Sequence, residues 1–394
     1  MEDFLFMRNN AIITPQVLIW AREHLDLSLK AASEYLKLDQ DKLLAWEEGR
    51  NYPTVRQAKD IAKKYKIPYV YFFLPEPPKN IKLPKNQDYR TFSNQPIKTF
   101  SIELKTLLFD IIQRREAMLQ LNNELSVTSP VFSYFFDVNI TDENIISEAI
   151  RNILNFSNIN NIKKYNIREA FNYFKDSLEK IGVLVFQAID IEPFEMRGIS
   201  VFDEVLPIIV VNRKDSYNAR IFTLMHEFVH LITKTAGICD SNGFSELTSL
   251  DIEIKCNHIA AQALVPDNLI KNNHVYLHLL NDWNDDAVRE LGNTFTVSRE
   301  VILGRLLSFE NINRRFYKQK LDQYTQEYFK SKTKEETGGY PTPSIDAESQ
   351  FGKTYISTVL TAYNQEVISA RDAIQYFDGL RLKHFDKLER WCFA

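Results

Sequence analysis

Hydrophobic positions recur at helical spacing over most of the chain. Between residues 12 and 74, each short periodic segment follows a residue that can cap a helix, and these residues are Thr14, Ser28, Asp39 and Thr54. Short helices joined by tight turns predict a helix-turn-helix bundle. Residues 97–180 predict longer amphipathic helices, to which we assign packing around the following region and no chemistry.

The pattern changes to β-type sequence after Gly182. Runs rich in β-branched residues, VLVFQAI, MRGISVFD and PIIVVN, are separated by turn residues and predict short strands. The next stretch, from Ile221 to Ile232, is apolar on all sides and predicts a buried helix. Helical spacing returns from Asp251 to Pro266, over residues 287–307 and in a tail beyond residue 351. The chain is therefore predicted to be α+β and predominantly helical.

These patterns divide the chain into parts with predicted boundaries. Residues 1–75 form the helix-turn-helix unit, and residues 76–96 form a linker, because the stretch from Pro75 to Pro96 is rich in proline and has little periodicity. Residues 97–310 form the main domain, and residues 311–394 form a basic helix, a linker and a helical C-terminal tail. A basic helix can touch nucleic acid or an acidic partner, but it is more often a solvated face.

Composition and charge limit the setting of the protein. The sequence contains no run of about 18 apolar residues and no signal peptide, which predicts a cytoplasmic protein without a membrane partner. The three cysteines, Cys239, Cys256 and Cys392, are too few and too scattered for a disulfide framework. A formal net charge of -4 argues against nucleic-acid binding over the whole surface.

The predicted buried helix carries a metal-binding pattern. Positions four apart lie on one face of a helix, so His226 and His230 can bind one ion, and Glu227 can reach a water on its open side. This H-E-x-x-H pattern predicts two zinc ligands and a general base. The alternative is a pair of core histidines that are satisfied by backbone carbonyls. Unpaired polar groups in a buried helix cost several kcal/mol each, which favours the metal site.

The following helix offers a third ligand. From Asp251 to Pro266, Glu253 and Asn257 recur at helical spacing with apolar residues, and Pro266 closes the run. An inward carboxylate near the start of this helix would complete a His, His, Glu site with one open position for water.

HEFVH followed by EIKCNHIAAQALVP resembles the ImmA/IrrE family of bacterial metallopeptidases. The second signature of that family runs E-x-x-(A/C)-N-x-x-A-A-x-x-L-x-P, and its first Glu, which corresponds to Glu253, is the third ligand. Asn257 is then a candidate to support the ligands from behind. Many relatives carry another Glu or an aromatic residue at Lys255, a position that is not a ligand. The resemblance implies a zincin-like metallopeptidase domain with a small β-sheet and one Zn²⁺ per chain.

An R-G-x-S element precedes the zinc helix. Arg197, Gly198 and Ser200 match this element of the family, and we expect them to border the cleft and bind substrate. In zincins the outer strand of the sheet holds substrate by strand addition. A purely structural hairpin is the alternative. Arg220, just before the helix, would bind substrate or bridge to a carboxylate.

The N-terminal region resembles the Xre class of helix-turn-helix domains through LSLKAASEYL and LLAWEEGRNYPT. IPYVYFFLPEPP is similar to the segment that joins an Xre domain to an ImmA/IrrE peptidase. The second helix of such a pair enters the major groove, so Gln40 and Lys42 can contact base edges, while Arg50 and Arg56 can contact phosphates. The carboxylates of Asp39 and Asp41 in the same segment disfavour DNA binding, because they repel phosphates. We predict binding of double-stranded DNA through residues 12–74, and a protein-docking or dimerisation bundle is the alternative.

Other histidines and cysteines are weaker candidates for chemistry. His274 and His278 are four apart in HVYLH, but no Glu accompanies them, which favours a surface turn over a second metal site. Cys239 and Cys256 can lie near the metal and respond to oxidation, although buried inert thiols are more common.

The family resemblance implies that the substrate is a regulatory protein, typically a repressor cut in response to stress or DNA damage. A helical tail similar to this one occurs in long Xre–ImmA/IrrE proteins encoded beside toxins, which makes a co-encoded toxin or antitoxin a candidate partner. One alternative is a DNA-binding transcriptional regulator or antitoxin of a toxin-antitoxin or phage-related locus, whose peptidase-like domain senses or docks. Another is a non-proteolytic zinc protein in which Glu227 only supports the ligands. A homodimer is compatible with either.

Overall fold

A computed structural model of the protein describes residues 10–25, 27–78, 101–137, 139–140, 142–156, 166–235, 249–278, 283–332 and 342–393. The chain divides into two compact units, residues 1–84 with 99–112, and residues 85–98 with 113–394. Most of the predicted linker 76–96 lies outside the described residues, as does Cys239. No helix in the described ranges is long and apolar enough to cross a membrane.

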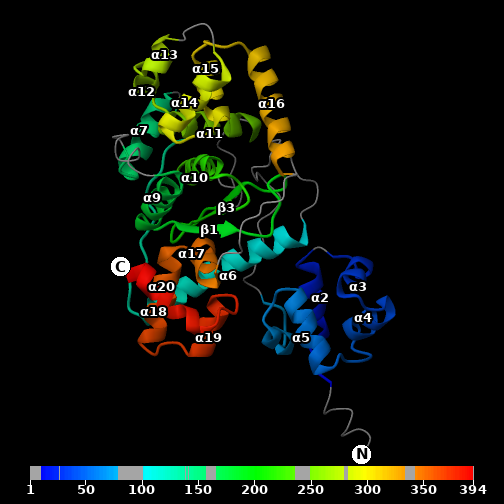
Figure 1. Ribbon diagram of the computed structural model, residues 1–394. Coiled ribbons are helices and arrows are strands. Elements are labelled where there is room, and N and C mark those ends of the chain that lie inside the picture. The colour runs from blue at the N-terminus through cyan, green and yellow to red at the C-terminus, as the bar shows by residue number, and fades with distance from the viewer. Residues whose placement is uncertain are drawn as a thin grey trace, which may run out of the picture. The chain divides into compact units, whose positions relative to one another are not determined.

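The first unit is a bundle of short helices (Figure 1). Ser28 and Asp39 accept hydrogen bonds from the first amides of the helices they precede, and Thr54 forms a capping box with Gln57. Thr14 occupies the N-cap position of the first helix, but its side chain makes no capping bond, and its hydroxyl donates to the Leu74 carbonyl (2.7 Å). The elements are α2 (Pro15–Glu23), α3 (Leu29–Leu36), α4 (Gln40–Glu47), α5 (Val55–Lys64), the 3₁₀ helix η1 (Tyr69–Phe73) and the first half of α6 (Ile102–Glu124).

The core of the first unit is aromatic and aliphatic, with Trp46, Tyr65 and Phe72 among its most buried side chains. One ion pair crosses this core. The Arg22 guanidinium donates through Nε to Glu47 Oε1 (2.7 Å), and the Glu47 side chain is only 5% exposed. Because this pair joins α2 to α4, it ties the first helix to the pair formed by α3 and α4.

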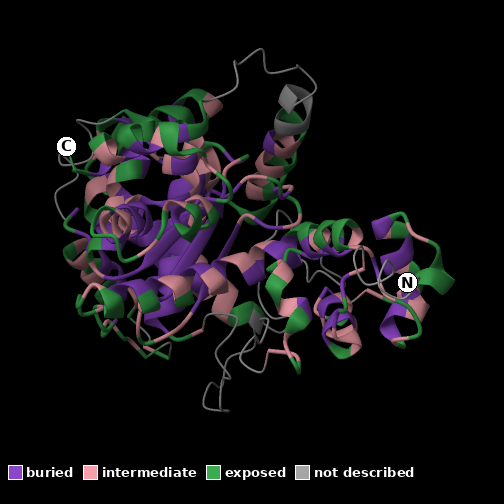
Figure 2. Cartoon of the chain, turned by 90° about the horizontal axis from the view of Figure 1, so that it is seen from below, coloured by how far each residue is buried: buried purple, intermediate pink, exposed green. Residues whose placement is uncertain are grey.

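The second unit is built on a three-stranded sheet with the strand order β1-β3-β2. β1 (Leu184–Ala188) runs parallel to β3 (Ile208–Asn212), and β2 (Gly198–Val201) runs antiparallel to β3. All strand residues are buried, as Figure 2 shows for the strands near its centre. Figure 1 shows α9 (Ile167–Lys180) and α10 (Tyr217–Ile232) on one side of the sheet and α17 (Pro343–Phe351) on the other. This double cover accounts for the continuous apolar runs in β1 and β3.

Besides α9 and α10, further helices of the second unit precede and follow α10 along the chain. They are α7 (Glu143–Ile153), α11 (Ser249–Leu264), α12 (Asp267–Lys271), α13 (His274–His278), α14 (Asp285–Phe295), α15 (Arg299–Ser308) and α16 (Arg314–Lys332). The helical tail continues with α18 (Lys353–Asn364), α19 (Ala370–Tyr376), η2 (Leu382–His384) and α20 (Phe385–Phe393). The predicted fold class, predominantly helical α+β with a small sheet and a helical tail, is confirmed.

Candidate metal centre

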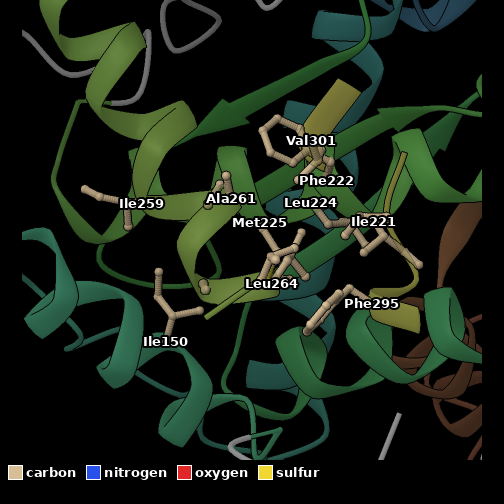
Figure 3. Packing of buried hydrophobic residues seen from close by; sticks show 14 of the residues in the cluster. Ile150, Ile221, Phe222, Leu224, Met225, Ile259, Ala261, Leu264, Phe295 and Val301 are labelled. Atoms are coloured by element: carbon tan, nitrogen blue, oxygen red, sulfur yellow. The ribbon is translucent and has the colours of Figure 1, made fainter. Parts of the chain in front are cut away.

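Helix α10 lies in the middle of the largest hydrophobic core. Ser216 caps its N-terminus by accepting from the Ala219 amide, and every residue from Arg220 to Ile232 is buried. Figure 3 shows Ile221, Leu224 and Met225 of α10 in a core with Ile259 and Leu264 of α11. Within this apolar helix His226 is 0% exposed and His230 is 3% exposed. The two imidazoles therefore sit one turn apart at a position that water scarcely reaches.

Helix α11 brings a carboxylate to the two histidines. Glu253 Oε2 lies 3.3 Å from His226 Nε2, and Glu253 Oε1 lies 3.0 Å from His230 Nε2. The two Nε2 atoms are 3.0 Å apart. Burial disfavours the charge on Glu253, but the neighbouring imidazoles of His226 and His230 outweigh it and hold the pKa of this carboxyl well below its usual range. Glu253 is therefore ionised at neutral pH.

These three side chains fit a zinc ion. Zinc binds imidazole nitrogen and carboxylate oxygen at about 2.0–2.2 Å, so neighbouring donors of a tetrahedral site lie about 3.3–3.6 Å apart, within a few tenths of an ångström of the separations here. When both imidazoles are neutral, three lone pairs converge on one point, and a cation stabilises that arrangement. Among the described residues, His226, His230 and Glu253 are the only group of this kind with converging metal-binding atoms.

The carboxylate of Glu227 is held by β2. Ser200 Oγ donates to Glu227 Oε2 (2.8 Å), and both side chains are buried. A Cβ atom at Gly198 would lie 2.3 Å from Thr223 Cγ2 and 2.8 Å from Glu227 Oε1, so only glycine allows this strand to approach α10 so closely. Gly198 and Ser200 thus form one wall around Glu227.

Arg197 has a different place from its two neighbours. Its Nε donates to Asp215 Oδ2 (3.0 Å), and the Asp215 side chain is only 2% exposed. This contact joins the start of β2 to the loop between β3 and α10. Substrate contact by the R-G-x-S element stays a prediction, and the contacts that the structure does show are with Glu227, Thr223 and Asp215.

Two groups lie behind His230, of which the sequence analysis expected Cys256 near the metal and missed Thr235. The Thr235 hydroxyl lies 2.9 Å from His230 Nδ1, and the buried Cys256 thiol lies 3.7 Å from the same atom. Asn257, which was expected in this role, is half-buried on α11, and no described hydrogen bond joins it to the three ligands. No sequence motif points to Thr235, because it lies beyond the end of the helix and faces His230 only through the turn that follows.

Several other candidate residues have structural partners. The Arg220 guanidinium donates to Gln187 Oε1 (2.8 Å) and stacks on Tyr217, so it bridges to an amide and not to a carboxylate. His274 of α13 pairs with the exposed Glu290 of α14. Among the described residues, His274 belongs to no group of converging metal-binding atoms.

The residues expected to contact DNA lie on the first unit. Gln40, Lys42 and Arg56 are exposed, and the first two stand at the N-terminus of α4. The Lys42 ammonium lies 5.4 Å from the centre of the Trp46 ring. Arg50 is exposed and pairs with Glu48. The Asp39 carboxylate already accepts from the amides of Asp41 and Lys42, so it occupies the helix terminus that would otherwise face a phosphate.

Residues 178–307 match the family model described as IrrE N-terminal-like domain (Peptidase_M78). The match runs from the end of α9 through the sheet to α15, so it contains the metal-binding cluster and Glu227. It does not reach the first unit or the C-terminal tail. No curated protein matches the chain. The match and the geometry together indicate a metallopeptidase-like domain of the ImmA/IrrE type.

Proposed function

We propose that this protein is a zinc-dependent endopeptidase that cleaves a regulatory protein. The observation that carries the proposal is the convergence of His226, His230 and Glu253 within 3.3 Å of one another, with the buried Glu227 next to His226 in the sequence of the same helix. The family match over residues 178–307 also supports a peptidase reaction.

The residues of the site have separate tasks in this mechanism. His226 and His230, as neutral imidazoles, and Glu253, as a carboxylate, would hold one Zn²⁺. When bound, the ion would polarise the scissile carbonyl and acidify water. Glu227 accepts the proton of the attacking water and passes it to the leaving amine, and the Ser200 hydroxyl holds one of its oxygens during both transfers.

The sheet supports an extended peptide as the substrate. β2 is an edge strand of the described sheet, and its partner is β3. Because Ser200 of β2 touches Glu227, a peptide added along the outer edge of β2 would pass close to the base. We infer a repressor or a co-encoded antitoxin or toxin as the protein that supplies this peptide.

Cleavage by matched variants tests the proposal. Wild-type protein and Glu227→Gln are each incubated with zinc and with the proteins encoded next to the gene, and the products are identified by mass spectrometry. We expect a new peptide terminus only with the wild type, and its loss on addition of a chelator. A cut that Glu227→Gln makes as fast as the wild type would exclude Glu227 as the base.

We also propose that the first unit binds double-stranded DNA, because it presents exposed Gln40, Lys42 and Arg56 on a bundle of short helices that includes α3 and α4. The double variant Arg50→Ala with Arg56→Ala should weaken binding to the DNA upstream of the gene and reduce the slope of log affinity against log salt concentration by about two. Equal binding by the wild type and the double variant would leave docking or dimerisation as the role of this unit.

DNA binding that persists in Glu227→Gln together with no cleavage by the wild type would favour a regulator whose peptidase-like domain senses or docks.

A further inference from the structure

A chain of hydrogen bonds leads away from the imidazole of His230. His230 Nδ1 lies 2.9 Å from Thr235 Oγ1, and Thr235 Oγ1 lies 2.9 Å from Thr233 Oγ1. Thr233 Oγ1 in turn donates to the Val229 carbonyl (2.7 Å). The chain therefore runs from a ring nitrogen through two hydroxyls to a backbone oxygen.

The last member of this chain sets the direction of every bond in it. The Val229 carbonyl can only accept, so the single hydroxyl proton of Thr233 is used there. Thr233 must then accept from Thr235, and Thr235 must accept from His230. The proton of neutral His230 consequently lies on Nδ1, and the lone pair of Nε2 points toward His226 and Glu253.

The end of α10 places both threonines. Lys234 has a left-handed conformation (φ 54°), the Lys234 amide donates to the Leu231 carbonyl (3.2 Å), and the Thr235 amide donates to the His230 carbonyl (2.9 Å). These two bonds form the common C-terminal motif that turns the chain back over the last helical turn. The turn brings Thr235 against His230, although the two residues are five positions apart.

We propose that Thr235, oriented by Thr233, is a positioning residue that fixes the tautomer and ring orientation of His230 and so raises the affinity of the His226, His230 and Glu253 site for zinc. The proposal rests on the proposed zinc-dependent function. Partners behind a metal-binding histidine typically change metal affinity by about 10–100-fold. The Cys256 thiol is the competing partner of Nδ1, but it is farther away (3.7 Å) and a weak acceptor.

Zinc affinity, measured by competition with a chromophoric chelator, tests the proposal in the full-length protein. Thr235→Val keeps the shape of the side chain and removes the acceptor, and it should weaken zinc binding by about 10–100-fold. Thr235→Ser restores the hydroxyl and should bind as the wild type does. Thr233→Val frees the Thr235 proton and should cause a smaller loss. Thr294→Val is the matched control for Thr233→Val. Like Thr233, Thr294 donates its hydroxyl to the carbonyl four residues earlier, that of Glu290 (2.9 Å), but it lies on α14 and not beside His230.

A spectroscopic measurement separates positioning from general damage. In zinc-loaded, ¹⁵N-histidine-labelled protein, the Nδ1 proton of His230 should be protected from exchange with water in the wild type and Thr235→Ser, and should exchange rapidly in Thr235→Val. Circular dichroism of the metal-free proteins should show the same helix content for the wild type and Thr235→Val, so that a loss of zinc affinity is not a loss of fold.

The outcomes distinguish this inference from the proposed function. Equal zinc affinity of the wild type and Thr235→Val would overturn the inference and leave the peptidase proposal standing. A loss in Thr235→Ser as large as in Thr235→Val, or a loss confined to Cys256→Ala, would also overturn it. A wild-type protein that binds no zinc would overturn both.

Discussion

At the scale of single residues, the environment of Glu227 decides what this carboxylate can do. It is 2% exposed, accepts from Ser200 Oγ, and faces the α-carbon of Gly198. A carboxylate in this setting has few conformations available, because one oxygen is held by a hydrogen bond and the strand lies against the other. Preorganisation of this kind is what a general base needs when it takes a proton and returns it to another atom.

The hydroxyl of Ser200 is therefore predicted to contribute to the rate and not to metal binding. Ser200→Ala should lower kcat/KM for the protein substrate by about 10–150-fold, since a hydrogen bond to a charged group contributes about 1.5–3 kcal/mol. Zinc content should stay at the wild-type level. Ser147→Ala is a suitable control, because it removes a similarly buried hydroxyl bond, to the Asn144 carbonyl, in the same unit. A rate equal to that of the wild type would remove Ser200 from the account.

At the scale of helices and strands, local periodicity predicted the metal ligands but not the residues that surround them. His226 and His230 could be placed on one face because helical spacing is a property of neighbouring residues, and Glu253 followed from the second helix and its family signature. The bond from Ser200 to Glu227 spans 27 residues and depends on how closely β2 approaches α10, which no local pattern encodes. Thr14 stands at the N-cap position as predicted, but its hydroxyl bonds to the carbonyl of Leu74, 60 residues away, and makes no capping bond to the helix, which local sequence could not show.

The end of helix α14 offers a prediction about stability. Thr296 caps this helix in a left-handed conformation (φ 60°), which a β-branched side chain adopts at a cost. Thr296→Gly should raise the free energy of unfolding by about 1 kcal/mol, measured by urea denaturation followed by circular dichroism. The same change in the interior of the helix, Glu290→Gly, should lower it by about 1 kcal/mol. A lower free energy of unfolding in both variants would mean that the Thr296 side chain makes a contact that stabilises the fold by more than its left-handed conformation costs.

At the scale of the whole molecule, the C-terminal tail is part of the second unit. The Gln187 amide of β1 donates to the Ser349 carbonyl (2.7 Å), and Arg213 pairs with Asp346 (2.7 Å). Glu179 of α9 accepts from the amide and the hydroxyl of Thr354 (2.9 and 3.1 Å). The tail therefore covers the face of the sheet opposite α10, and its docking is held by buried polar groups as well as by apolar packing.

This docking predicts a pH dependence of stability. Burial raises the pKa of Glu179 to about 7, against the opposing effects of Lys175 and Thr354. Because the folded protein holds the Glu179 proton more tightly than the unfolded chain, stability is greatest below about pH 4.5 and is lost as the pH rises toward 7. The loss amounts to about 3 kcal/mol at most. Glu179→Gln should remove this part of the pH profile, and identical profiles for both proteins between pH 5 and 8 would contradict the assignment.

The zinc content of three proteins tests the central claim most directly. Wild-type protein, Glu227→Gln and Glu253→Ala are purified in parallel, and bound metal is measured by mass spectrometry of the acid-digested samples. The account predicts about one zinc per chain in the wild type and in Glu227→Gln, and little in Glu253→Ala, because Glu253 is a ligand of the ion and Glu227 is not. Zinc retained in full by Glu253→Ala, or absent from the wild type, would contradict the assignment of His226, His230 and Glu253 as the metal site.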